Sequence, residues 1–239
     1  MRQIVAMGGS GFFGGVPSGL DRFVVELASN IRSAARPKVC FVGTATGDAP
    51  EYALNFHRAY GALGCETSDL GLFARTVGDL QGFLEDKDAV YVGGGNTVSL
   101  LAVWRAHGLD TALRSAYGSG TILCGSSAGM NCWFEASVTD SFDLARLDGV
   151  RDGLGILSGS ACPHYDGEAE RRPTLHRLLA GGFPACVAAE NDVALHYKDE
   201  VLAEVVTTRA GATAYLVRTE GGAVVEERLQ SRLFKDVPA

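Results

Sequence analysis

Ser127 stands at the centre of a Gly-Ser-Ser-Ala-Gly motif at positions 125–129, between an apolar, β-rich stretch (121–124) and a segment that can form a helix. A serine between small residues at a strand-to-helix turn can be held with its hydroxyl above the carboxyl end of a sheet, where a nucleophile acts. The same motif also fits an ordinary glycine–serine turn. The motif alone therefore does not show whether Ser127 is a nucleophile, and the other segments of the chain have to be considered.

A serine hydroxyl becomes a useful nucleophile only when a base within hydrogen-bond reach removes its proton. His164 is the best-placed histidine, because it ends an extended run (160–165) after the serine and lies at a Tyr-Asp-Gly turn. Its position suits a base at the edge of a sheet as well as it suits a structural histidine. The other histidines fall in predicted helices or in an alternating strand: His57, His107, His176 and His196.

Three carboxylates between the serine and the histidine could orient that base: Glu135, Asp140 and Asp143. A triad is defined by geometry rather than by chain order, so the order serine, acid, histidine is allowed. Metal chemistry is not indicated, because the sequence holds no His-Glu-x-x-His motif, no His-x-His pair and no carboxylate cluster at ligand spacing. We therefore expect neither a metal nor another cofactor.

Two glycine-rich stretches follow expected strands. Gly93, Gly94 and Gly95 precede a helix that Asn96 can cap, and their approachable N–H groups suit an oxyanion hole, although a tight turn would need glycine too. The stretch 8–15 contains Gly-x-Gly-x-x-Gly, as dinucleotide-binding proteins do. Here residues 16–19 separate it from the helix, and no acidic residue lies between positions 26 and 48. We therefore interpret 8–15 as a flexible loop at the carboxyl edge of the first strand.

Strands and helices alternate over the first half of the chain. Apolar strands are expected at 4–7, 38–44, 88–92 and 121–124, with helices between them, which is typical of a parallel α/β sheet. Right-handed crossovers bring the following loops to one edge, so the glycines at 93–95 and Ser127 are expected to be neighbours. Beyond them we expect a polar loop at 135–152, a helix at 168–180 and short closing strands from 185 onward. All of these belong to a single expected domain, 1–239.

Composition is typical of a globular protein: the chain has 239 residues, of which 46% are hydrophobic and 21% are charged. Its net charge of −7 offers no basic face to nucleic acid or anionic lipid, so a small molecule or a peptide is the expected partner.

The six cysteines form no Cys-x-x-Cys pair, and no run approaches the ~20 apolar residues that span a bilayer. We therefore expect a cytoplasmic protein without membrane contact, and the sequence leaves a homodimer open.

Three motifs, taken together and in this order, resemble those of one family: Gly-Gly-Gly-Asn-Thr at 93–97, Gly-Ser-Ser-Ala-Gly at 125–129 and Cys-Pro-His-Tyr at 162–165. They are similar to motifs of the S51 serine peptidases, the peptidase E (aspartyl dipeptidase) and cyanophycinase group. The resemblance covers at least residues 4–195. It implies a class I glutamine amidotransferase-like fold, which is a three-layer α/β/α sandwich with a mainly parallel central sheet, and a serine where those amidotransferases carry cysteine.

Carried over residue by residue, the resemblance makes Ser127 the expected nucleophile and His164 the expected base. Gly94 or Gly95, together with the amide of Ala128, would form the oxyanion hole. Loss of one such donor typically lowers the rate by ~10²–10³-fold. The implied reaction is peptide hydrolysis through an acyl-enzyme intermediate.

The acid of the family lies in the loop after the nucleophile helix. This implies Asp140, because it follows a threonine as in peptidase E, or else Asp143. The implied substrates are short peptides, foremost dipeptides. Peptidase E recognises an N-terminal aspartate through an arginine shortly after the histidine, which implies Arg171 or Arg172 here, and Asn96 is also expected at the substrate. The alternatives are a solvated helix face for the two arginines, a cyanophycinase-like hydrolase of β-linked Asp-Arg chains, and a non-catalytic binding protein on the same scaffold.

Overall fold

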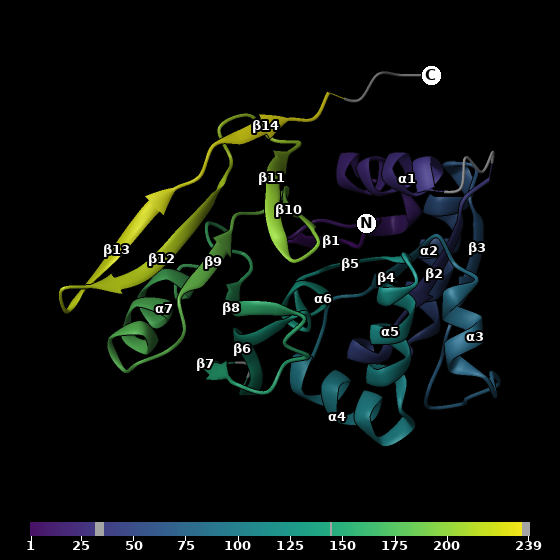
Figure 1. Cartoon of the computed structure of the whole chain (residues 1–239), viewed down its shortest axis with the longest axis horizontal. Helices are drawn as coiled ribbons and strands as arrows, with labels where there is room; N and C mark the ends of the chain where they lie inside the picture. The colour runs from purple at the N-terminus through teal and green to yellow at the C-terminus, as the bar shows by residue number, and fades with distance from the viewer. Residues whose placement is uncertain (32–35, 144, 236–239) are drawn as a thin grey trace.

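A mostly parallel sheet of eight strands forms the centre of the protein (Figure 1). The computed structural model describes residues 1–31, 36–143 and 145–235. The parallel strands are β1 (Gln3–Met7), β2 (Lys38–Val42), β3 (Glu66–Asp69), β4 (Ala89–Val92) and β5 (Ile122–Ser126). They lie in the order β1-β5-β4-β2-β3. The strands expected at 4–7, 38–44, 88–92 and 121–124 are thus confirmed.

Helices cover both faces of this sheet (Figure 1). One face carries α1 (Gly19–Ile31) and α2 (Pro50–Ala62), and the other carries α3 (Leu80–Glu85), α4 (Thr97–His107) and α5 (Leu109–Gly118). Successive strand residues point to opposite faces, so in β1 Val5 and Met7 join the core under α1 and α2. Ile4 and Ala6 join the core under α3, α4 and α5. Because both faces are covered, β1, β4 and β5 are buried along their whole length, and the expected three-layer α/β/α arrangement results.

The second half of the chain extends this sheet and builds another one beside it (Figure 1). Strands β10 (Val193–Lys198), β11 (Val201–Thr207) and β14 (Ser231–Leu233) continue the first sheet beyond β1, where β10 pairs antiparallel with β1. The six-stranded second sheet contains β6 (Phe134–Asp143), β7 (Arg146–Val150), β8 (Leu157–Cys162), β9 (Cys186–Ala189), β12 (Ala214–Glu220) and β13 (Ala223–Arg228), in the order β13-β12-β9-β8-β6-β7.

The structure corrects the expectation for residues 135–152. They form the antiparallel hairpin of β6 and β7 rather than a polar loop. The apolar face of β6 packs on α7 (Arg171–Ala180), because Ala136 and Val138 share a core cluster with Leu175 and Leu179. The helix expected from position 168 begins at Arg171. Within the described residues, no helix is both long enough and apolar enough to cross a membrane.

Candidate active site

Ser127 occupies the turn between β5 and the four-residue helix α6 (Ala128–Asn131), with backbone angles φ 59° and ψ −111°. A positive φ is uncommon outside glycine and marks a sharp, strained turn. The N–H of Ser127 donates to the carbonyl of Met7 at 3.1 Å, which ties the turn to the end of β1. A Cβ at Gly125 would lie 2.6 Å, and one at Gly129 2.1 Å, from the carbonyl oxygen of Val92. The glycines of the motif therefore permit the close packing that forms the elbow.

His164 follows β8 and approaches Ser127 from the second sheet. Its Nε2 lies 2.9 Å from Ser127 Oγ, within the reach of a general base. Its backbone also has a positive φ, 53°, and its N–H donates to the carbonyl of Gly8 at 2.9 Å. The structure thus brings the predicted nucleophile and the predicted base together, both at strained backbone positions.

The other ring nitrogen of His164 meets a residue that the sequence did not single out. Nδ1 lies 2.8 Å from Oδ1 of Asn191, in the turn between β9 and β10. Because an amide oxygen only accepts, Nδ1 carries the proton, and Nε2 keeps the lone pair that can take the proton of Ser127. Gly9 makes room for this contact, since a Cβ there would lie 2.0 Å from Asn191 Oδ1 and 2.5 Å from His164 Nδ1.

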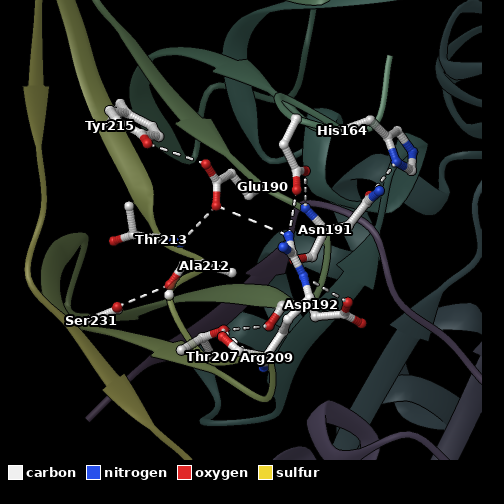
Figure 2. A network of polar contacts seen from close by, with 12 residues as sticks. His164, Glu190, Asn191, Asp192, Thr207, Arg209, Ala212, Thr213, Tyr215 and Ser231 are labelled. Atoms are coloured by element: carbon white, nitrogen blue, oxygen red, sulfur yellow. Dashed lines mark hydrogen bonds and ion pairs between the residues drawn. The ribbon is translucent and has the colours of Figure 1, made fainter.

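Arg209, just beyond β11, holds the turn that carries Asn191 (Figure 2). Its guanidinium donates to the Asn191 carbonyl at 3.1 Å and to Asp166, whose other oxygen accepts the Asn191 N–H at 2.8 Å. Asp192 and Glu190 lie 3.4 Å and 4.0 Å from the same guanidinium. Partial burial lowers the pKa of Arg209, but these carboxylates outweigh it and raise that pKa above its ordinary value. A network of side chains therefore positions the partner of the histidine.

Gly94 lies directly beside Ser127, since a Cβ on it would be 3.3 Å from the Cβ of Ser127. Among the described residues, no backbone hydrogen bond engages the N–H groups of Gly94 and Gly95. Ala128 is the first residue of α6, so its N–H has no acceptor within that helix. The three donors predicted for an oxyanion hole thus come from the two loops that meet at Ser127.

A cleft of about 740 Å³ opens at Ser127 and His164. It lies at the carboxyl ends of β1, β4 and β5, where open α/β sheets bind their ligands. Its volume falls within the ~300–1,000 Å³ of small-ligand sites. The aromatic lining consists of Phe12, Phe41, Tyr52 and Tyr91, and the polar lining includes Thr46, Asn55 and the carboxylates Glu51 and Asp192.

The glycine-rich loop at 8–15 forms one wall of this cleft and is anchored by polar contacts. Ser10 donates its N–H to Ser126 Oγ and its hydroxyl to Ser18 Oγ, each at 3.1 Å. Ser18 in turn donates its N–H and its hydroxyl to Asp21, each at 2.7 Å. Burial raises the pKa of the Asp21 carboxyl, although the hydrogen bonds from Ser18 and Tyr60 oppose this effect. The loop that the sequence predicted to be flexible is therefore tied to Ser126, the residue before Ser127.

None of the three carboxylates predicted as orienting acids forms a hydrogen bond to the ring of His164, whose partners among the described residues are Asn191 and Ser127. Because 134–143 continues as a strand instead of a loop, β6 carries Asp140 along the second sheet, and Asp140 does not line the cleft. Asp143 accepts a backbone N–H within its own hairpin, and Glu135 accepts one from β8. Both ring nitrogens of His164 are engaged by other residues, with Asn191 in the place expected for the acid.

The residues predicted to bind substrate also have other partners. Arg171 is buried, with its guanidinium 2.8 Å from Glu168. Arg172 lies 3.4 Å from Glu226 of β13, and neither arginine lines the cleft. Asn96 caps α4 by accepting the N–H of the third helical residue at 2.8 Å. The helix at 171–180 packs on the second sheet, which explains why its first-turn arginines do not line the cleft.

Cys124 lies on β5, three residues before Ser127, but its thiol is not a reactive nucleophile. Burial holds the pKa of its thiol well above the ordinary value, so it stays protonated and apolar. Among residues 1–31, 36–143 and 145–235, no group of three His, Cys, Asp or Glu side chains is arranged to hold a metal ion.

A serine at a strand-to-helix elbow, hydrogen-bonded to a histidine in a cleft of an α/β sheet, is the arrangement of a serine hydrolase. The sequence model of Peptidase family S51 matches residues 5–205 of this chain. The chain therefore belongs to peptidase family S51 and is a serine-type peptidase. The family predicted from the three sequence motifs is confirmed.

Known proteins resemble the chain over most of its length. "Uncharacterized peptidase YgaJ" of Bacillus subtilis (strain 168) is 42% identical over 219 residues, which are 91% of this chain and 92% of that protein. "Peptidase E" of Streptomyces coelicolor is 33% identical over 135 residues, 55% of this chain and 52% of that protein. The crystal structure of a peptidase from an acI-B1 actinobacterium matches with a TM-score of 0.70 at 16% identity, covering 97% of this chain and 95% of that one. The predicted class I glutamine amidotransferase-like fold is confirmed.

Proposed function

We propose that this peptidase hydrolyses short peptides, foremost dipeptides, with Ser127 as nucleophile, His164 as general base and Asn191 as the residue that orients the histidine. The observation that carries the proposal is the 2.9 Å contact between His164 Nε2 and Ser127 Oγ within the cleft. Membership of family S51 supports serine chemistry. A cleft of about 740 Å³ suits a short peptide.

In the first half of the reaction, His164 Nε2 accepts the hydroxyl proton of Ser127 as Oγ attacks the carbonyl carbon of the scissile bond. The carbonyl oxygen becomes negative, and the amides of Gly94, Gly95 and Ala128 are the proposed donors that stabilise it. The protonated imidazole then gives its proton to the nitrogen of the leaving amine, and the C–N bond breaks. The N-terminal part of the peptide remains as an ester on the serine.

In the second half, a water molecule gives a proton to His164 Nε2 and attacks the ester, after which the serine recovers its proton and the acid leaves. Asn191 keeps the imidazole in one tautomer throughout, because its Oδ1 accepts from Nδ1. A neutral amide adds no full negative charge beside the imidazolium, so Asn191 contributes chiefly orientation. The Cys-His-Asn sites of papain-like proteases use an asparagine in the same place.

The nucleophile is tested by replacing each of the two adjacent serines. Ser127→Ala should lower kcat on a dipeptide library by about 10⁶-fold, as loss of a serine nucleophile does elsewhere. Ser126→Ala is the matched control, because Ser126 Oγ accepts from Ser10 rather than contacting His164, and its loss should stay within about tenfold. Thermal unfolding of both variants checks that the fold is intact.

A fluorophosphonate probe tests the same assignment without a peptide. It should add covalently to the wild type and to Ser126→Ala but not to Ser127→Ala, as the mass of the intact protein reports. Undiminished hydrolysis by Ser127→Ala, or labelling of that variant, would contradict the assignment. A wild type that neither hydrolyses a peptide nor reacts with the probe would favour the binding-protein alternative.

A further inference from the structure

Among the described residues that line it, the cleft holds negative but no positive side chains. Its two carboxylates are Glu51 and Asp192, and Arg171 and Arg172 are engaged elsewhere. A side-chain carboxylate of a substrate, placed beside Glu51 and Asp192, would therefore meet like charges and no guanidinium among the lining residues. This environment is the opposite of the one that an N-terminal aspartate needs.

The two carboxylates of the cleft differ in how far they are already neutralised. Asp192 lies 3.4 Å from the guanidinium of Arg209. Glu51 lies in the first turn of α2 and is exposed to the cleft. Within the part of the chain that the structure describes, its carboxylate makes no ion pair or hydrogen bond. Glu51 is therefore the anionic group that is available to a substrate.

We propose that Glu51, assisted by Asp192, selects peptides that carry a cationic group on the residue N-terminal to the scissile bond and disfavours N-terminal aspartate and glutamate. This inference rests on the proposed function, because it names the substrate class of the same cleft. The group bound is an ammonium or guanidinium, held by a charge-assisted hydrogen bond to a carboxylate oxygen. Glu51 acts as a specificity residue and takes no part in the proton transfers.

The aromatic wall of the cleft completes this subsite. Phe12 packs edge-on against Tyr91 and Phe41, with ring centroids 5.2 Å and 5.7 Å apart. A long basic side chain can lay its apolar stem along such a wall while its charged end reaches a carboxylate. The wall also lowers the local dielectric constant, which strengthens the attraction. The same carboxylate could bind the α-ammonium of an unblocked peptide, so the experiment separates the two sources of charge.

The kinetic test compares Lys-Ala, Met-Ala and Asp-Ala as substrates of the wild type and of Glu51→Gln. We expect kcat/KM of the wild type to fall in the order Lys-Ala, Met-Ala, Asp-Ala. Glu51→Gln should lower kcat/KM for Lys-Ala about tenfold and raise it for Asp-Ala, because a charge-assisted contact and a like-charge repulsion are both removed. Glu66→Gln, which removes an exposed carboxylate of β3 outside the cleft, should leave all three values unchanged.

N-acetyl-Lys-Ala distinguishes the two sources of positive charge. If Glu51 binds the α-ammonium, acetylation should lower kcat/KM of the wild type about tenfold and abolish the difference between wild type and Glu51→Gln. If Glu51 binds the lysine side chain, that difference should persist after acetylation. The second outcome supports selection of a cationic side chain at Glu51, and the first would overturn it, because every unblocked dipeptide carries an α-ammonium.

A binding measurement keeps the test independent of turnover. In calorimetric titrations, Ser127→Ala should bind Lys-Ala more tightly than Asp-Ala, and adding Glu51→Gln should weaken Lys-Ala binding about tenfold. A wild type that prefers Asp-Ala, or a Glu51→Gln variant that loses equally on all three substrates, would overturn the inference. Binding of Lys-Ala through Glu51 without any hydrolysis by the wild type would refute the proposed reaction and support the subsite.

Discussion

The proposed nucleophile, Ser127, and the proposed base, His164, come from two sheets that hold them by different means. Ser127 lies where β5, β4 and α6 pack backbone against backbone, so closely that a Cβ at Gly129 would be 2.1 Å from a carbonyl oxygen of β4. His164 comes from the second sheet, and Asn191 orients it through a side-chain hydrogen bond. Arg209 in turn holds the backbone of Asn191.

This difference implies two patterns of response to substitution. Backbone atoms that already touch cannot make room for a new carbon, so a change on the serine side should disturb the elbow as a whole. Hydrogen bonds between side chains can be removed one at a time, and each loss leaves the others in place. We therefore expect a severe effect on the serine side and a graded series on the histidine side.

Gly129→Ala should show the largest effect. Its added carbon meets the Val92 carbonyl, so the free energy of unfolding should fall by about 3 kcal/mol and hydrolysis should be lost with the elbow. Denaturant unfolding and a dipeptide assay measure the two losses. Gly61→Ala in α2 is the matched control, since nothing lies within 4 Å of its added carbon, and it should be neutral or stabilising by up to about 1 kcal/mol. A Gly129→Ala variant that is stable and active would contradict the expected difference between the serine side and the histidine side.

Asn191→Ala should have the next largest effect. It removes the partner that fixes the tautomer of His164, so kcat/KM should fall by about 10²–10⁴-fold while the melting temperature changes little. Asp140→Asn and Asp143→Asn should stay near the wild type. The reverse result, a large loss only in Asp140→Asn or Asp143→Asn, would restore a carboxylate as the orienting group.

Asn191→Asp sharpens the same comparison through the pH dependence of the reaction. A carboxylate beside the ring would stabilise the imidazolium form of His164 relative to the neutral imidazole, because opposite charges attract. Since the base acts in its neutral form, the acid limb of the profile of kcat/KM against pH should move to higher pH. An unchanged profile would show that position 191 does not face the imidazole during the reaction.

Arg209→Ala should lower kcat by about tenfold with little change in KM, because Arg209 acts through Asn191 and does not line the cleft. A double-mutant cycle checks this order of action. In an Asn191→Ala background, Arg209→Ala should cause no further loss of kcat. Additive losses would mean that the arginine acts independently of the asparagine.

Asp21→Asn should affect pH-dependent stability and have the smallest effect on activity. Asp21 is fully buried, and burial raises its folded pKa above the ordinary 3.8. Its contribution to stability is therefore complete below the unfolded pKa and is lost as the pH rises through the folded pKa. Asp21→Asn has no carboxyl group to titrate at this position. The difference in the free energy of unfolding, Asp21→Asn minus wild type, should therefore increase as the pH rises from the unfolded pKa of Asp21 to its folded pKa. A difference that is the same at every pH would contradict this role.

The serine side could be predicted because its constraints are local in the sequence. Gly125 and Gly129 flank Ser127 within five positions, and the apolar strand before them is a continuous run. Parallel strand order then brings the loop of Gly94 to the same edge. The structure places these residues together, as the strand and helix pattern predicted.

The prediction failed where the chain leaves that pattern. Polar residues between 135 and 152 concealed a hairpin, so Asp140 was expected in a loop beside the site but lies along β6. The Glu-Asn-Asp turn at 190–192, between two apolar strands, was visible as a turn, but nothing local marked Asn191 as the partner of His164. That contact joins positions 27 apart.

The sequence by itself determined the α/β order of the first half, the elbow and the candidate histidine, because each rests on the types of neighbouring residues. Only the tertiary structure decided which group faces Nδ1 of His164 and which charges line the cleft. Both depend on how the second sheet meets the first: Gly9 lies against Asn191 and His164 at that junction, and Arg209 ties the junction together from beyond β11. Contacts between side chains of separate sheets depend on how those sheets pack together, and no local pattern in the amino-acid sequence encodes that packing.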